Sequence, residues 1–169
     1  MSLLAKHQIV NAHLLATADK GRPRSASLRR AVSTAYYAVF HAVCAACADR
    51  LVGWRQPWTV YTPIFRAPDH YATTQALREP FLTAIPELQR LGLLLKELQS
   101  AREWADYNPE PRPNYRLGTN DTPFTRQEAM RLIDSAAEAI SIIDQLDDDS
   151  RLKLATRLVP RTRKMNPLR

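Results

Sequence analysis

Apolar residues recur at helical spacing, every three or four positions, in several long segments of this chain. Four helices are predicted from this spacing, and a further short one from the run SRLKLATRLV. No stretch shows the strict alternation of apolar and polar residues that indicates a strand, so the sequence predicts an all-α protein. The long helices are expected over residues 2–18, 25 or 27 to 51, 86 or 87 to 107, and from Thr125 to the acidic run 147–149.

Polar residues mark where these helices begin and end. Ser25 or Ser27 is expected to cap the second helix, and Thr125 to Glu128 forms a capping box for the fourth. Asn108 and three nearby prolines end the third helix. Residues 52–70 carry three prolines and four aromatic residues, which favour a partly buried excursion or short helical turns.

The second helix is apolar nearly all round but carries one mixed polar and aromatic row. At 100° per residue its deep apolar stripe comprises Leu28, Val32, Ala35, Val39 and Ala46, and the opposite row comprises Arg30, Thr34, Tyr37, His41 and Cys44. A water-facing row would carry lysine and glutamate, so another helix or a second subunit is expected to cover it. The alternative is a core histidine whose hydrogen bonds are satisfied locally.

The cysteines of this helix do not form a metal or redox site. His41, Cys44 and Cys47 are spaced along two helical turns, about 9 Å, which is too far for three ligands of one zinc ion. The CAAC motif lies near the end of the helix, away from the N-terminal amide dipoles that activate such thiols. We therefore expect neither a metal nor a cofactor, and we interpret both cysteines as buried small side chains.

Arg102 occupies an unusual position on the apolar stripe of the third helix, on the same side as Leu91, Leu95 and Leu98. Asp106, one turn later, is a partner for it. One interpretation is that the pair attaches the helix end to the proline-rich loop that follows. The other is that Arg102 belongs to a binding site.

The net charge of +7 is confined to the end of the chain. All 17 acidic and 17 of the 24 basic residues lie within residues 1–150, so the excess belongs to the last 19 residues. A smaller basic cluster comprises Lys20, Arg22, Arg24, Arg29 and Arg30. We predict one domain over residues 1–149 and a basic tail over 150–169 that attracts nucleic acid non-specifically. No signal-peptide core or membrane span is predicted, so a cytoplasmic location is expected.

Two blocks of the sequence together resemble the prokaryotic HEPN-domain proteins. The first is SLRRAVSTAYYAVFHAV, with Arg30, Ser33, the Ala-Tyr-Tyr-Ala run from Ala35 and Phe40-His41 in the family's pattern. The second is AREWADYNPEPRPNY followed by FTRQEA, which has the Arg-x-x-Ala-Asp-Tyr run, a proline-bearing loop and the Phe-Thr-x-x-Glu-Ala helix start. Both blocks occur in the family's order.

The resemblance implies a four-to-five-helix up-and-down bundle that forms a homodimer and acts on RNA or binds nucleotides. Many members are ribonuclease toxins or defence effectors, often paired with a small nucleotidyltransferase-type antitoxin. Their catalytic motif is an arginine followed after four to six residues by histidine, and this chain lacks it. Arg66 to His70 is one residue too short, and at Arg102 the histidine position is held by Tyr107.

This departure leaves catalysis open. Metal-independent RNA cleavage needs a general base and a general acid, roles that suit histidine better than tyrosine. We assign the catalytic roles to His41, Arg102 and Tyr107, and RNA or nucleotide binding to Arg30, Tyr37 and Asp106. The alternative is a non-catalytic, antitoxin-like subunit that acts through dimer or partner contacts.

Overall fold

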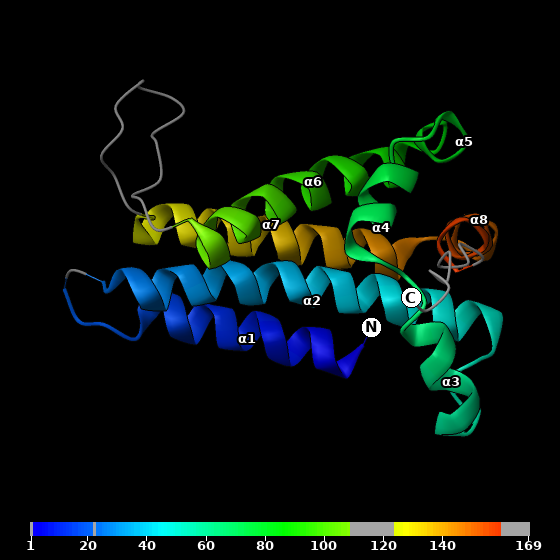
Figure 1. The fold of residues 1–169 in the computed structure, drawn as a ribbon, viewed down its shortest axis with the longest axis horizontal. Helices are drawn as coiled ribbons and strands as arrows, with labels where there is room; N and C mark the ends of the chain where they lie inside the picture. Colours follow the sequence, from blue (N-terminus) through cyan, green and yellow to red (C-terminus); the bar gives the residue numbers. More distant parts are fainter. Residues whose placement is uncertain (1, 22, 109–123, 160–169) are drawn as a thin grey trace, which may run out of the picture.

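The part of the chain that the structure describes is all-α, as the apolar spacing predicts. The computed structural model describes residues 2–21, 23–108 and 124–159. Within these residues there are eight helices and no strand, packed compactly (Figure 1). The helices are α1 (Leu3–Thr17), α2 (Ser25–Leu51), α3 (Trp58–Phe65), α4 (His70–Ala76), α5 (Pro80–Thr83), α6 (Pro86–Tyr107), α7 (Arg126–Gln145) and α8 (Asp148–Leu158).

The long helix α2 is the centre of the fold and contacts α1, α3, α6, α7 and α8. Four members of its predicted apolar stripe, Leu28, Val32, Ala35 and Val39, are at most 1% exposed, whereas the fifth, Ala46, is only half-buried. By length and composition α2 could cross a membrane, but 78% of that apolar window is buried inside the protein. Helix α2 is therefore a core helix whose apolar surface is covered by the other helices.

Helices α1, α6 and α7 run alongside α2 (Figure 1). The predicted leucines of α6 all enter the core: Leu88, Leu91, Leu95 and Leu98 are fully buried. At the start of α7 the predicted cap is present, since Thr125 Oγ1 accepts a hydrogen bond from the Glu128 amide at 3.1 Å. The next residue, Arg126, donates to the carbonyls of Ala16 and Gly21, which ties α7 to the end of α1.

The predicted serine cap of α2 is wrong. The helix begins at Ser25 itself, and the capping position is Arg24, which makes no side-chain capping hydrogen bond. Arg24 instead bonds Asp19 through both its amide and its Nε, at 3.0 and 2.9 Å. The turn between α1 and α2 is therefore held by an acidic side chain before the helix rather than by a serine within it.

Residues 52–85 form three short helices. α3 lies within the predicted excursion and projects away from the bundle (Figure 1). Helices α4 and α5 were not predicted, because they are too short for a periodic pattern to emerge. Asp69 caps α4 by accepting a hydrogen bond from the Ala72 amide at 3.0 Å. α4 ends against α6, where Gly92 faces the backbone of Leu77.

Helix α8 begins at the acidic run that was expected to end α7. Asp147 caps α8 by accepting a hydrogen bond from the Ser150 amide at 2.6 Å. Leu154, Ala155 and Leu158 are buried, and α8 contacts both α2 and α4. The predicted short helix in SRLKLATRLV is confirmed, and it packs against the bundle.

Candidate functional site

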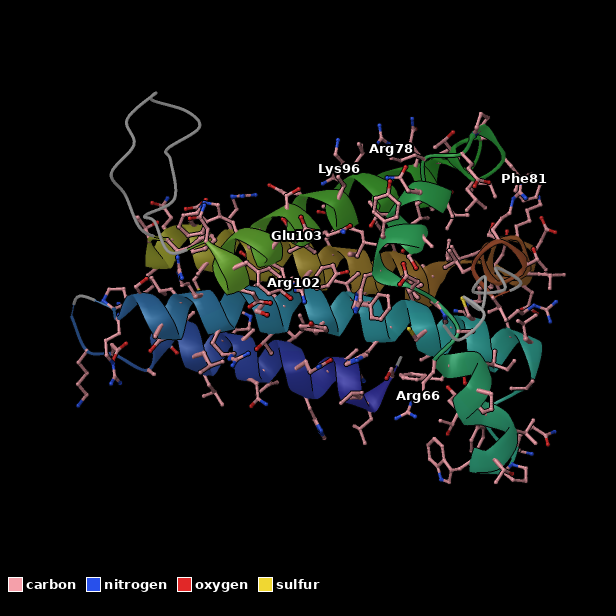
Figure 2. The ribbon with its side chains drawn as sticks, viewed as in Figure 1. Arg66, Arg78, Phe81, Lys96, Arg102 and Glu103 are labelled. Atoms are coloured by element: carbon pink, nitrogen blue, oxygen red, sulfur yellow. The ribbon has the colours of Figure 1, made fainter. Side chains whose placement is uncertain are left out.

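The structure brings Arg102 of α6 against Tyr37 of α2, so the two anomalies of the sequence meet. The Nη2 of Arg102 donates a hydrogen bond to Tyr37 Oη at 2.7 Å. Figure 2 shows Arg102 on the side of α6 that faces α2. The predicted pairing with Asp106 is confirmed, with Arg102 Nε 2.9 Å from Asp106 Oδ2. Ser33 Oγ of α2 also donates to Asp106 Oδ2, at 3.2 Å.

Tyrosine rings surround the guanidinium of Arg102. Its carbon lies 5.9, 5.4 and 5.2 Å from the ring centroids of Tyr36, Tyr37 and Tyr107, within the range of cation–π attraction. Nη2 also reaches Tyr107 Oη at 3.4 Å. The buried Nε makes its ion pair without hydrogen-bond geometry. These contacts hold the Arg102 guanidinium between α2 and the end of α6.

A histidine from α4 completes this cluster. His70 stacks on Phe40 with ring centroids 3.8 Å apart and lies edge-on to Tyr37 at 5.7 Å. Its Nδ1 is 2.8 Å from Tyr36 Oη. Burial, and then the positive charge of Arg102, lowers the pKa of His70 below the ordinary histidine value of 6.5. His70 is therefore neutral at pH 7.

The hydrogen bond with Tyr36 assigns the tautomer of His70. Tyr36 is 1% exposed, and burial raises the pKa of its phenol, so the hydroxyl keeps its proton. In the described part of the chain that hydroxyl has His70 Nδ1 as its hydrogen-bond partner. Since a buried hydroxyl needs an acceptor, Tyr36 donates to Nδ1, and the remaining proton of the imidazole lies on Nε2.

The predicted site residue His41 lies beside this cluster, one turn beyond Tyr37. Its ring is 6.1 Å from the Tyr37 ring and 6.0 Å from the Phe65 ring. Its Nδ1 is 3.0 Å from Gln8 Oε1 of α1. Burial, and then the nearby His70, lowers the pKa of His41.

The polar row of α2 is largely covered by the chain's own helices α1, α3, α4 and α6. Arg30, at the start of that row, is the exception. Its side chain is exposed and, among the described contacts, none joins it to Arg102 or Tyr37. The structure thus assembles Tyr37, Arg102, Asp106 and Tyr107, places His41 next to them and leaves Arg30 apart.

Sequence reasoning missed His70. Its signal was the Arg66-Ala-Pro-Asp-His70 run, which was set aside because the spacing is one residue short and the segment is rich in proline. Asp69 caps α4, so His70 occupies the first position of that helix. His70 therefore reaches the cluster from a third helix, independently of the pattern around Arg66.

The cysteines behave as the sequence predicts, as buried apolar side chains. Both are free and buried, and burial raises the pKa of the Cys47 thiol to about 12. Burial raises the pKa of Cys44 as well. Among the described residues, His, Cys, Asp and Glu side chains do not gather in any group of three or more that would suit a metal ion.

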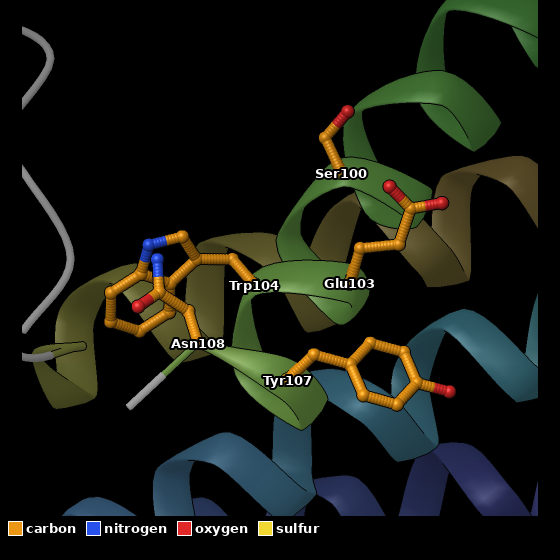
Figure 3. A pocket seen from close by; sticks show the side chains of 5 residues that line it. All are labelled: Ser100, Glu103, Trp104, Tyr107 and Asn108. Atoms are coloured by element: carbon orange, nitrogen blue, oxygen red, sulfur yellow. The ribbon is translucent and has the colours of Figure 1, made fainter. Parts of the chain in front are cut away.

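A shallow open pocket of about 450 Å³ adjoins the cluster on the outer side of α6. It is lined by Ser100, Glu103, Trp104, Tyr107 and Asn108 (Figure 3). Tyr107 belongs to both the pocket and the Arg102 cluster. The Glu103 carboxylate repels anions from the pocket itself, so the anion-attracting part of this surface is on the Arg102 side of Tyr107.

The basic clusters found in the sequence are partly neutralised within the fold. Arg24 pairs with Asp19, and Arg29 donates to the Asn108 carbonyl while its guanidinium lies 4.9 Å from the Trp104 ring. In α8, Lys153 pairs with Asp149, and Arg157 pairs with Glu79. The last basic residues of the predicted tail, Arg161, Arg163, Lys164 and Arg169, lie outside the described residues.

Comparison with known proteins identifies no family, because no protein-family model, curated protein or solved structure matches the chain.

Proposed function

We propose that this chain is a HEPN-like domain that binds RNA or a nucleotide through a phosphate at the Arg102 cluster. The observation that carries the proposal is the placement of Arg102, whose side chain is 16% exposed and which contacts Tyr37 and Tyr107 beside a neutral histidine. Two sequence blocks distant in the chain contribute to this one cluster. Their convergence supports the resemblance from which the proposal starts.

The groups of the cluster suit a phosphate. A guanidinium presents planar donors that match phosphate oxygens, and Asp106 holds it in one orientation. Tyrosine hydroxyls and the Nε2–H of His70 add neutral donors, which need not be desolvated as ions when the ligand binds. Asp106 offsets one positive charge, so we expect a moderate affinity that falls as salt rises.

The hydrogen bond of His70 favours binding over cleavage at this imidazole. A general base for the ribose 2'-hydroxyl needs an unprotonated imidazole nitrogen facing the substrate, whereas Nδ1 of His70 is occupied by Tyr36 and Nε2 carries the proton. Cleavage with His70 as the general base requires the Tyr36 to His70 hydrogen bond to reverse. We therefore expect the protein to bind RNA measurably and to cleave it slowly or not at all. The other candidate base is His41, whose Nδ1 lies 3.0 Å from Gln8 Oε1, an acceptor, which leaves Nε2 without a proton.

The decisive experiment replaces Arg102. We expect Arg102→Ala to weaken binding of a fluorescently labelled RNA, and of AMP measured by calorimetry, at least about tenfold, because a charge-assisted hydrogen bond contributes about 1.5–3 kcal/mol. Arg102→Lys should recover part of the loss. Arg90→Ala, at an exposed arginine on the same helix that pairs with Glu138, is the matched control. Affinity unchanged in Arg102→Ala would refute the site.

Cleavage is measured on the same proteins with total RNA or tRNA. If the wild type cuts RNA, His70→Ala and His41→Ala identify which imidazole takes part. Their circular dichroism spectra report whether each variant keeps its helices. If RNA cleavage persists in both variants, neither His70 nor His41 is the catalytic base or acid.

A second candidate is a non-catalytic interaction subunit, and a surface on α1 favours it. Leu3, Val10 and Leu14 are 67%, 56% and 60% exposed and form an apolar stripe on one face of the helix. Exposed apolar stripes of this kind are typical of helix pairing. The partner under this proposal is a second copy of the chain or a nucleotidyltransferase-type antitoxin.

Light scattering after size-exclusion chromatography tests the homodimer. We expect a dimeric wild type and a monomeric Val10→Glu, Leu14→Glu variant with an unchanged helical spectrum. Leu93→Glu is the control, since Leu93 is 60% exposed on α6, away from this stripe. A monomeric wild type would contradict self-association through α1.

A further inference from the structure

The projecting helix α3 and the turn before it expose two tryptophans. Trp54 and Trp58 are 71% and 77% exposed, and no residue of α3 is buried. Tryptophan is the largest side chain and is highly buried on average. Two of them on a projecting arm indicate a surface that binds something aromatic or apolar.

A continuous series of ring contacts runs from this arm into the bundle. The ring of Trp58 is 5.6 Å from Tyr61, and that of Tyr61 is 6.1 Å from Phe65. Phe65 is 6.0 Å from His41, which is 6.1 Å from Tyr37. We call these five rings the aromatic track. It joins the exposed tip of α3 to the tyrosine at the proposed phosphate site.

The arm is also positively charged. Between Asp49 and Asp69 the chain carries three arginines and no acidic residue, and two of them, Arg55 and Arg66, lie outside α2. The Arg55 guanidinium lies 5.0 Å from the Trp54 ring. Arg66, where α3 joins the bundle, is exposed and has no ion pair or hydrogen bond from its side chain within the described residues (Figure 2). Asp49, at the border, accepts a hydrogen bond from Tyr61 at 2.9 Å.

We propose that Trp54, Trp58 and the aromatic track form a stacking platform for unpaired nucleobases, which leads an RNA strand to Arg102. This inference rests on the proposed function for the nature of its ligand. Every base has a face that can stack on an aromatic ring, and arginines beside the rings attract the phosphates. The platform is therefore expected to tolerate different sequences and to reject fully paired RNA.

A membrane surface is the other ligand that exposed tryptophans and arginines could favour. The track argues for RNA, because it runs inward to the Arg102 cluster. Binding of α3 to a bilayer surface would not require ring contacts that continue into the bundle. The test below includes vesicles so that the two ligands give different results.

The experiment uses the Trp54→Ala, Trp58→Ala double variant of the full chain. Both side chains are exposed, so the fold should be unaffected. The matched control is Phe81→Ala, an exposed ring on α5 that lies 5.2 Å from the Arg157 guanidinium and is far from α3 (Figure 2). The probes are a labelled single-stranded RNA of about ten nucleotides, its duplex form, AMP, and vesicles containing phosphatidylserine.

We expect the double variant to bind the single strand at least about tenfold more weakly, since each stacked base contributes about that factor or more. AMP binding should be unchanged, because AMP can reach the Arg102 cluster without the arm. The wild type should bind the duplex less tightly than the single strand, and the single strand should quench its tryptophan fluorescence. Phe81→Ala should match the wild type.

Several results would overturn the platform. Single-strand affinity unchanged in the double variant is one, and equal loss of AMP binding is another. Tryptophan-dependent binding to vesicles with RNA binding intact would assign the arm to a membrane instead.

The two proposals fail separately. If Arg102→Ala keeps RNA affinity while the double variant loses it, the phosphate site is wrong and only the stacking of bases on Trp54 and Trp58 stands. The reverse result removes the platform alone. A wild type that binds neither RNA nor AMP overturns both.

Discussion

Gly92 of α6 faces the end of α4, and replacing it by alanine sets two opposing effects against each other. A Cβ at this position would lie 2.9 Å from the backbone oxygen of Leu77 and 3.2 Å from its Cβ. Both distances are shorter than van der Waals contact. Since Leu77 directly follows α4, relief of the clash requires that helix, which carries His70, to move away from α6.

The magnitude follows from the two effects. Alanine stabilises a helix interior by about 1 kcal/mol relative to glycine. Overpacking a well-packed interface costs about 1–3 kcal/mol, and here the obstacle is backbone rather than a flexible side-chain end. We expect a net loss of about 1 kcal/mol in the free energy of unfolding, which for a chain of this size lowers Tm by about 2–4 °C.

Thermal unfolding followed by circular dichroism measures this change. Ser100→Ala is the control, because Ser100 is exposed on the same helix and gains helix propensity without a clash. We expect Ser100→Ala to be slightly more stable than the wild type. If Gly92→Ala is also more stable, by about the full 1 kcal/mol of helix propensity, then α4 does not pack against α6 as described.

Two further predictions concern the histidines and α8. Because burial lowers the pKa of His41 and His70 below the 6.5 of an ordinary histidine, the unfolded chain binds more protons than the folded one as pH falls through that value. The free energy of unfolding, from urea titrations, should therefore decrease below about pH 6.5, and a slope unaltered by replacing both with asparagine would contradict this origin. Leu154→Ala in α8 should cost about 2–5 kcal/mol, as for other fully buried leucines, whereas Leu152→Ala, 37% exposed, should cost much less. Equal effects at both positions would mean that α8 does not belong to the packed bundle.

Local pattern alone predicted the long helices. In α6 the proline at its start and Asn108 at its end mark its limits, and the four leucines mark its buried face. Helix α7 follows from its capping box and isoleucines. These features act within a few residues, so they can be read without knowledge of the fold. The predicted serine cap of α2 is wrong because the helix begins at Ser25 itself, so Arg24 occupies the capping position.

Helical spacing alone shows that Arg102 and the Tyr37 row are unusual on their helices, because a charged or polar group on an apolar face requires a partner. Helical spacing already pairs Arg102 with Asp106, but its contact with Tyr37 is a property of the tertiary structure. Tyr37 and Arg102 are far apart in the chain, and their contact depends on how α6 packs against α2.

The position of His70 also could not be predicted from the sequence. Nothing near it in the sequence indicates where the proline-rich path through α3 returns to the bundle. Its place against Tyr36 and Phe40 is set by the packing of α4 among α2, α6 and α8. The apolar pattern of a helix determines which of its faces is buried. Which side chains meet depends on how the connecting turns orient the helices relative to one another.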